Sequence, residues 1–250
     1  MSEPRLLKTA SGALLYDAAR RETAQEQWFE RDYWERAGAI AHETAGRGSV
    51  LVVRHGAETW VLRHYHRGGL VARLIDDHYV WLGVERTRAF REWRLLTGLR
   101  SAGLPVPNPV AARVVRTGAI YTADIITTYL PNTRGLSVFL ADGQPPQDCW
   151  TRIGEMLRSF HEHGVDHPDL TAHNILLDPR GNVFLVDFDN AAIKPPGRWQ
   201  QAGVARFKRS LRKVALETGT DFDQAAWQQV EDAYYRRSPS ATDDPPASSA

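Results

Sequence analysis

The sequence predicts an α+β fold of two lobes, with an antiparallel sheet in the first lobe and mainly helices in the second. Runs with strand character gather before residue 130, and long segments with helical spacing dominate after it. A chain of 250 residues is long enough for two lobes that share a cleft. We place the N-lobe at 1–130, the C-lobe at 131–237 and a disordered tail, rich in Ser, Pro, Ala and Asp, at 238–250.

Local patterns predict the elements of the first lobe. Short runs rich in β-branched, aliphatic and aromatic residues predict strands. These runs lie at 13–16, 50–53, 59–65, 110–116 and 119–127. An amphipathic helix is expected at 23–40, where four aromatic residues from Trp28 to Trp34 fall roughly on one face. A second helix is expected at 83–99, before a segment rich in Gly and Pro that stops it.

The second lobe shows mainly helical patterns. Apolar residues at helical spacing predict helices at 146–164 and 222–235, and between them two short apolar runs at 174–177 and 183–186 predict a hairpin. The segment 190–216 has no acidic residue and seven Lys or Arg, with apolar residues at helical spacing. We interpret it as a helix whose basic face meets either solvent or an anionic surface.

One stretch of the second lobe carries the residues that phosphoryl transfer requires. The spacing His167-x-Asp169-x-x-x-x-Asn174 is that of a kinase catalytic loop, and Asp187-Phe188-Asp189 stands where kinases place Asp-Phe-Gly. Asp169 would accept or orient the proton of a substrate hydroxyl. Asn174 and Asp187 would supply oxygen ligands to Mg²⁺ beside ATP. The predicted hairpin would fix the spacing of these two ligands.

A hairpin rich in Asp and Asn, with no catalytic function, is the alternative interpretation of this stretch. An isolated Asp-x-x-x-x-Asn would be weak evidence for catalysis. Here His167 precedes the pattern and Asp187 follows it at the end of an apolar strand, so the catalytic interpretation is the stronger one. Asp189 stands in the place of the usual Gly, and either binds a second metal ion or caps the next turn.

Candidate phosphate-binding residues lie in the first lobe. Gly46-Arg47-Gly48 precedes a strand, where glycines allow backbone N–H groups to approach phosphates, although a plain turn is the alternative. Kinases carry a phosphate-binding Lys on the following strand. No Lys occurs between Lys8 and Lys194, and Arg63 takes the position. An Arg binds phosphate bidentately, so it is not geometrically equivalent to Lys.

Two further positions complete the expected ATP site. Glu92, in the middle of the predicted second helix, is preferred over Glu85 as the carboxylate that orients Arg63. Tyr129 and Leu130 end the last strand of the first lobe, where backbone groups of a hinge would meet adenine.

Composition limits the class and the compartment. Net charge is +1, and only four of the 31 basic residues are Lys, which leaves 27 Arg. The one cysteine, Cys149, excludes an intramolecular disulfide, favours a reducing compartment and is more readily a buried apolar residue than a nucleophile. No apolar run reaches the roughly 18 residues of a membrane span, and no signal peptide is apparent. We expect a cytoplasmic protein without a nucleic-acid partner.

Several motifs resemble those of one known family, the 3-deoxy-D-manno-octulosonic acid (Kdo) kinases of the lipopolysaccharide kinase group, which have a protein-kinase-like fold. The resemblance runs from about residue 25 to about residue 235. It rests on Gly46-Arg47-Gly48, Leu62-Arg63-His64-Tyr65-x-Arg67-Gly68-Gly69-Leu70, Glu85-Arg86-Thr87-Arg88 with Phe90-x-Glu92, Gly103-Leu104-Pro105-Val106-Pro107-x-Pro109-Val110-Ala111-Ala112-Arg113, Tyr121-x-Ala123-Asp124, His167-x-Asp169-Leu170-x-Ala172-His173-Asn174-Ile175-Leu176-Leu177 and Asp187-Phe188-Asp189.

The resemblance implies ATP- and Mg²⁺-dependent phosphorylation of the 4-hydroxyl of Kdo on a Kdo-lipid A precursor, in lipopolysaccharide core biosynthesis. It also implies a peripheral protein on the anionic inner-membrane surface, at the cytoplasmic face, in a Gram-negative bacterium. Arg63 in place of Lys resembles the family's own habit. Arg67, His167 and His173 are candidate contacts of the acceptor. The surplus of Arg suits an acceptor that carries a carboxylate and phosphates.

Three other functions are compatible with the catalytic motifs. A kinase of a heptose or an aminoglycoside would share them, but the Arg-His-Tyr-x-Arg-Gly-Gly block argues against it. A pseudokinase that binds a partner would explain the missing Lys, although Asp169, Asn174 and Asp187 are all present. A protein kinase is disfavoured because Asp187-Phe188-Asp189 is followed by no Ala-Pro-Glu.

Overall fold

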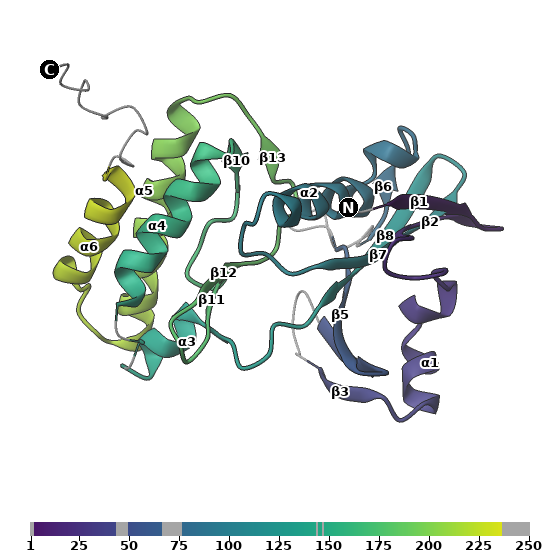
Figure 1. Ribbon diagram of the computed structural model, residues 1–250, viewed down its shortest axis with the longest axis horizontal. Helices are drawn as coiled ribbons and strands as arrows, with labels where there is room; N and C mark the ends of the chain where they lie inside the picture. The colour runs from purple at the N-terminus through teal and green to yellow at the C-terminus, as the bar shows by residue number, and fades with distance from the viewer. Residues whose placement is uncertain (1–2, 44–49, 67–76, 144, 147, 237–250) are drawn as a thin grey trace, which may run out of the picture.

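The computed structural model describes residues 3–43, 50–66, 77–143, 145–146 and 148–236. Within these residues, eight strands of the N-lobe form one antiparallel sheet in the order β1-β2-β7-β8-β5-β4-β3, with β6 paired to β8 (Figure 1). The strands are β1 (Pro4–Lys8), β2 (Gly12–Asp17), β3 (Ile40–Glu43), β4 (Val50–His55), β5 (Glu58–His64), β6 (Tyr79–Val80), β7 (Pro109–Thr117) and β8 (Ile120–Thr128).

Each face of this sheet has its own core, because successive side chains of a strand point to opposite faces. The helical elements that cover the two faces are η1 (Glu26–Phe29), α1 (Arg31–Arg36), η3 (Val84–Arg86) and α2 (Arg88–Ser101). Leu14 and Trp60 pack on the side of η1 and α1. Leu15 belongs to the core that holds Trp93 of α2, and this core continues into the C-lobe as far as Phe207. Figure 1 shows α2 between the sheet and the helices of the C-lobe.

The continuous helix predicted at 23–40 is wrong, although its aromatic face is right. The chain forms η1 and α1 instead, separated by Glu30 in an extended conformation, and then enters β3. Trp34 Nε1 donates to the carbonyl oxygen of Trp28 at 2.8 Å. In a continuous helix this carbonyl would instead accept from the backbone N–H four residues later. Burial of Trp28 and Trp34 against the sheet decides the local structure here.

Strand β1 was not predicted because its sequence lacks the pattern of a half-buried strand. All five of its residues are exposed, and it pairs only with β2 at the edge of the sheet. The neighbouring β2 has five buried or nearly buried positions in a row, which agrees with the strand expected at 13–16.

Helices dominate the C-lobe, as predicted. They are α3 (Leu136–Ala141), α4 (Cys149–Glu162), α5 (Arg198–Thr218) and α6 (Gln224–Tyr235). The short strands of this lobe are β9 (Arg134–Gly135), β10 (Val165–Asp166), β11 (Ile175–Leu177), β12 (Val183–Leu185) and β13 (Ala192–Ile193). Strands β11 and β12 form the predicted hairpin, with Ile175 opposite Leu185. Cys149 is buried at the start of α4.

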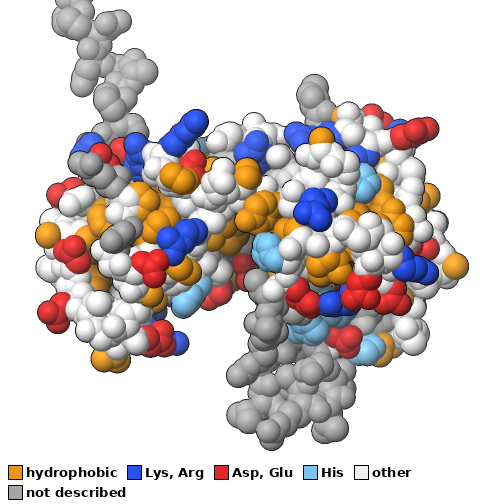
Figure 2. Space-filling view, turned by 90° about the horizontal axis from the view of Figure 1, so that it is seen from below, with side chains coloured by type: hydrophobic (Ala, Val, Ile, Leu, Met, Phe, Trp, Pro, Cys, Tyr) orange, Lys and Arg blue, Asp and Glu red, His pale blue; other side chains and the backbone are white. Residues whose placement is uncertain are grey.

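The surface reflects the near-neutral composition. Figure 2 shows charges of both signs mixed with apolar patches over one face of the two lobes. No helix within the described ranges combines the length and the apolar character needed to cross a membrane.

Helices α4 and α6 approach each other closely at Gly154. A Cβ atom at this position would lie 2.7 Å from Cβ of Ala233 and would also collide with the carbonyl oxygen of Val230. Such contacts leave no room for a methyl group, so Gly154 sets the distance between the two helices.

We expect Gly154→Ala to lower the free energy of unfolding by about 1–3 kcal/mol, because the added methyl must push α6 away from α4. Gly98→Ala is the matched control, since Gly98 lies inside α2 with open space around it. That control should be neutral or stabilising by about 0.5–1 kcal/mol. Urea unfolding measures both values. Equal stability of the two variants would contradict the close packing at Gly154.

Candidate active site

The catalytic-loop residues are brought together by hydrogen bonds within the loop that follows β10. Asn174 Nδ2 donates to the backbone oxygen and to Oδ2 of Asp169, both at 2.8 Å. The N–H of Asn174 donates to the carbonyl oxygen of Thr171 at 3.1 Å. Asp169 itself is exposed, so its carboxylate is oriented by Asn174 while it remains open to a ligand.

Helix α5 supports this loop from the side. Arg206 Nη1 donates to the carbonyl oxygen of His167 at 3.2 Å, and Ser210 Oγ accepts from the N–H of Ala172 at 2.9 Å. Arg206 and Ser210 are four residues apart, so they lie on one face of α5. This contact was not predicted, because it depends on the packing of two segments nearly 40 residues apart.

Asp187 follows the hairpin in a left-handed conformation, with φ 64°. The N–H of Val186 donates to the carbonyl oxygen of Asn174 at 3.0 Å, which fixes the two predicted metal ligands relative to each other. Phe188 is buried between the rings of Phe160 and His167, with centroid distances of 5.9 and 5.0 Å. A left-handed residue other than Gly costs about 1 kcal/mol or more, so burial of Phe188 helps to hold this conformation.

Arg63 lies at the centre of the site. On β5 its side chain is only 20% exposed, and Nη2 donates to both carboxylate oxygens of Glu92, at 2.6 and 2.5 Å. Nη1 donates to Oδ1 of Asp187 in the C-lobe. Tyr65 donates its hydroxyl to Oε2 of Glu92 at 2.5 Å. The structure thus pairs Arg63 with Glu92, as the sequence predicted, and adds an ion pair with Asp187 that was not predicted.

Burial and charge act in opposite directions in this cluster. Burial alone would lower the pKa of Arg63, but the carboxylates of Glu92 and Asp187 outweigh it and raise this pKa above its ordinary value. Burial raises the pKa of Glu92, and the Arg63 guanidinium opposes that rise. Arg63 therefore remains a fixed cation at the site, and its charge is shared between two carboxylates.

A second cation of the site was not predicted. Arg88, the first residue of α2, donates through Nε to Oδ1 of Asp189 at 2.8 Å and through Nη2 to Oδ2. The two roles expected for Asp189, binding a second metal ion or capping the next turn, do not include this ion pair. The surplus of Arg over Lys was the available signal, but no sequence pattern links two residues 101 positions apart.

The histidines proposed as acceptor contacts differ in their environments. His167 is buried, bonds through Nε2 to the carbonyl oxygen of Val186 at 3.2 Å and packs against Phe188. Burial lowers its pKa, so the ring is neutral. His167 therefore supports the loop, which corrects its assignment as an acceptor contact. His173 is exposed, and its contact with the acceptor stays a prediction.

The hinge and the glycine-rich segment complete the expected nucleotide site. The N–H of Tyr129 donates to the carbonyl oxygen of Thr59 at 2.8 Å, and the carbonyl oxygen of Leu130 accepts from Thr133 Oγ1 at 2.8 Å. The N–H of Tyr129 is therefore already used, whereas the Leu130 carbonyl has a second lone pair that can accept a further hydrogen bond. Gly46, Arg47, Gly48 and Arg67 lie outside the described residues.

The side chains of Asn174 and Asp187 carry donor atoms of the kind that a magnesium ion prefers. Both offer oxygen, and Mg²⁺ is commonly held by one or two protein ligands together with substrate phosphates and water. Among the described residues, no cluster of three or more His, Cys, Asp or Glu side chains is placed to hold a metal. The site therefore fits an ion that arrives with a phosphate ligand better than a closed protein cage.

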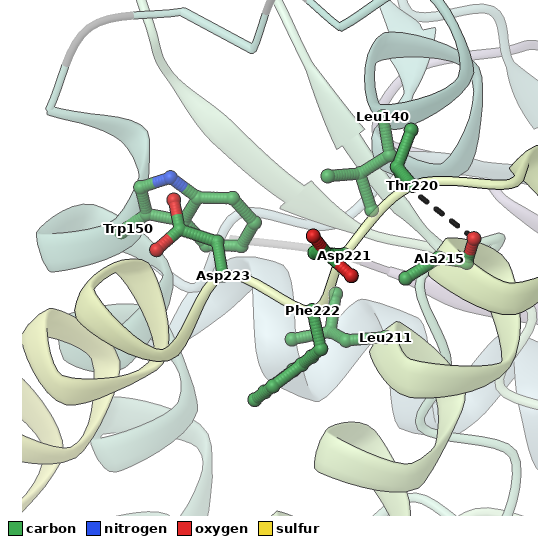
Figure 3. A pocket seen from close by; sticks show the side chains of 8 residues that line it. All are labelled: Leu140, Trp150, Leu211, Ala215, Thr220, Asp221, Phe222 and Asp223. Carbon is green, nitrogen blue, oxygen red and sulfur yellow. Dashed lines mark hydrogen bonds between the residues drawn. The ribbon is translucent and has the colours of Figure 1, made fainter.

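A small pocket of about 50 Å³ lies elsewhere in the C-lobe (Figure 3). Its walls come from α3, α4, α5 and the segment before α6, and include Trp150, Leu211 and Phe222. None of the predicted site residues lines it. The pocket is therefore separate from the candidate active site.

The sequence matches the lipopolysaccharide kinase (Kdo/WaaP) family over residues 31–234. The chain belongs to this family. The matched range includes the catalytic loop, Arg63 and Glu92.

Individual relatives agree with the assignment to this kinase family. A 3-deoxy-D-manno-octulosonic acid kinase of Xylella fastidiosa (strain M12) is 40% identical over 225 residues, which cover 89% of each chain. One of Vibrio parahaemolyticus serotype O3:K6 is 34% identical over 210 residues, which cover 84% of this chain and 88% of the relative. The solved structure of WaaP in complex with acyl carrier protein aligns with a TM-score of 0.57 over 94% of this chain and 90% of that one, at 18% identity. The predicted two-lobed, kinase-like α+β fold is confirmed.

We expect Arg63→Ala to raise the KM for ATP about tenfold or more with a smaller effect on the acceptor, because it removes the cation predicted to bind phosphate. Arg63→Lys keeps the charge but loses the two separate nitrogens that meet Glu92 and Asp187, and should give an intermediate value. Arg54→Ala, on the adjacent β4, removes an exposed arginine as a control. Steady-state kinetics with each substrate varied separately measures these effects. A raised acceptor KM with unchanged ATP KM would place Arg63 in the acceptor site instead.

Proposed function

We propose that this kinase transfers the γ-phosphoryl group of ATP to the 4-hydroxyl of Kdo on a Kdo-lipid A precursor. The observation that carries the proposal is the joint arrangement of Asp169 with Asn174 and of Arg63 with Glu92 and Asp187, in a chain whose relatives are named Kdo kinases. Phosphoryl transfer depends mainly on positioning and charge stabilisation, which is what these residues supply.

Asp169 acts on the acceptor hydroxyl. Its Oδ2 accepts from Asn174, which fixes the carboxylate in one orientation. The hydroxyl oxygen forms a bond to the γ-phosphorus, the bond from that phosphorus to the β–γ bridging oxygen breaks, and ADP leaves. The hydroxyl proton passes to the Asp169 carboxylate.

Arg63 and the metal ligands act on the phosphates. Arg63 is held by Glu92 and offers its second nitrogen toward the C-lobe, where Asp187 lies. A guanidinium in this position would bind the negative oxygens of the nucleotide. Asn174 and Asp187 would hold Mg²⁺, which neutralises charge on the phosphates when bound.

The location we propose is the cytoplasmic face of the inner membrane of a Gram-negative bacterium. Arg209, Arg212, Lys213 and Leu216 follow the spacing of one helical face of α5, and all four are exposed. The side chain of Leu216 is 82% exposed. Cations beside an exposed apolar residue suit an anionic lipid surface, to which each cation contributes about 1 kcal/mol of attraction.

Asp169→Asn should abolish phosphoryl transfer while it preserves the fold, because the amide can accept a hydrogen bond but cannot take the hydroxyl proton. The assay uses labelled ATP, a Kdo-bearing lipid A precursor and Mg²⁺, with mass analysis of the product. Near-normal turnover of Asp169→Asn would contradict the assigned base. Transfer to a heptose or aminoglycoside but not to Kdo-lipid would replace the proposed acceptor, and ATP binding without any transfer would favour a pseudokinase.

Sedimentation with vesicles tests the membrane surface. The wild type should bind vesicles rich in phosphatidylglycerol and not those of phosphatidylcholine alone, and Arg209→Glu with Lys213→Glu should weaken this binding about tenfold or more. Arg5→Glu with Arg36→Glu changes net charge equally at exposed N-lobe positions and serves as the control. Equal loss in both double variants would mean that net charge, not this face of α5, governs binding.

A further inference from the structure

Two arginines of the N-lobe bond two aspartates of the C-lobe, one on each side of Phe188. Arg63 on β5 pairs with Asp187, and Arg88 at the start of α2 pairs with Asp189. Both contacts cross between the lobes. The proposed function gives Arg63 and Asp187 roles at the phosphates and the metal, but it gives none to Arg88 and Asp189.

The Arg88–Asp189 pair has the geometry of a fixed contact. It is bidentate, and the two side chains are only 21% and 23% exposed. The Arg88 guanidinium lies 4.8 Å from the ring centre of Tyr79 and 5.9 Å from that of Tyr65. The N–H of Arg88 donates to the hydroxyl of Tyr121 at 3.2 Å. Stacking and bidentate bonding restrict an arginine far more than a single exposed ion pair does.

Arg88 and Glu92 are four residues apart, so they lie on the same face of α2. Glu92 is buried and holds Arg63 through both carboxylate oxygens. A rotation or outward swing of α2 would therefore release Arg88 from Asp189 and withdraw Glu92 from Arg63 in the same movement.

The aspartate side of the pair is fixed within the C-lobe. Phe188 is buried against Phe160, and the N–H of Ala191 donates to the carbonyl oxygen of Phe188 at 2.9 Å. Asp189 thus extends from a turn that its own lobe holds in place. Helix α2 packs on the N-lobe sheet through Trp93, and Arg88 joins its first turn to the C-lobe at Asp189.

We propose that Asp189 is a positioning residue: through Arg88 it holds α2 where Glu92 aligns Arg63 for the nucleotide. The inference rests on the proposed role of Arg63. It accounts for a carboxylate where kinases have Gly in Asp-Phe-Gly, because a Gly at this position would leave Arg88 without this partner. Since Arg88 and Asp189 have no role at the phosphates, their pair can join the lobes while Arg63 and Asp187 bind ligands.

The test combines kinetics with hydrogen exchange of α2 in the full chain. Asp189→Asn and Arg88→Gln should each raise the KM for ATP about tenfold and leave the acceptor KM within about twofold. The double variant should resemble each single variant, because both substitutions remove the same contact. In all three, amides in the first two turns of α2 should exchange about tenfold faster without nucleotide, while those of α4 and α6 keep the wild-type rate.

Arg94→Gln is the matched control. Arg94 lies on α2, like Arg88, and forms a bidentate pair with Glu85 of η3. This pair is exposed and stays within the N-lobe. It should change neither the ATP KM nor the exchange of α2.

Three results would overturn the inference. The first is that Asp189→Asn keeps the wild-type ATP KM and the wild-type exchange of α2. The second is that the double variant raises the ATP KM by the product of the two single effects, and the third is that Arg88→Gln changes only the acceptor KM. A wild type that transfers no phosphate to Kdo-lipid, with α2 exchange faster in the variants, would instead refute the proposed function and leave the positioning contact standing.

Discussion

The arrangement of the site depends on the buried carboxylate of Glu92. A charge in an apolar core requires a partner, and loss of that partner typically costs about 3–5 kcal/mol. Glu92 obtains its partner from Arg63 on β5 and a further hydrogen bond from Tyr65. This ion pair links α2 to β5, in addition to the apolar packing of α2 on the sheet, and it lies beside Asp187 of the other lobe.

The arginine at position 63 bonds two carboxylates at once, which suits a guanidinium better than the ammonium of a lysine. The planar guanidinium gives one nitrogen to Glu92 and another to Asp187, whereas an ammonium is a compact point charge with no fixed fork. Arg88 uses its planar group differently, with Nε and Nη2 on the two oxygens of one carboxylate, that of Asp189. Both arginines thus use two guanidinium nitrogens at the junction of the lobes.

The catalytic loop is supported by the C-lobe independently of these ion pairs. Arg206 and Ser210 of α5 hold its backbone, and His167 packs beneath it against Phe188. A neutral, buried histidine suits this supporting role, because it offers hydrogen bonding without the cost of a buried charge. Asp169 itself is exposed, so the backbone of the loop is held in place while this carboxylate remains accessible.

The sequence by itself determined the kinase fold, the β11–β12 hairpin and the placement of Asp169, Asn174 and Asp187, because their spacing along the chain is short and the hairpin fixes it. The pairing of Arg63 with Glu92 was also predicted, since both stand at recognisable positions of a kinase lobe.

Only the tertiary structure decided the rest. The break in the predicted helix at 23–40, the burial of His167 and the Arg88–Asp189 pair each depend on which faces of distant elements meet. The local sequence shows which face of an element is apolar and which residues are charged. The packing of whole elements decides which distant residue each of them contacts.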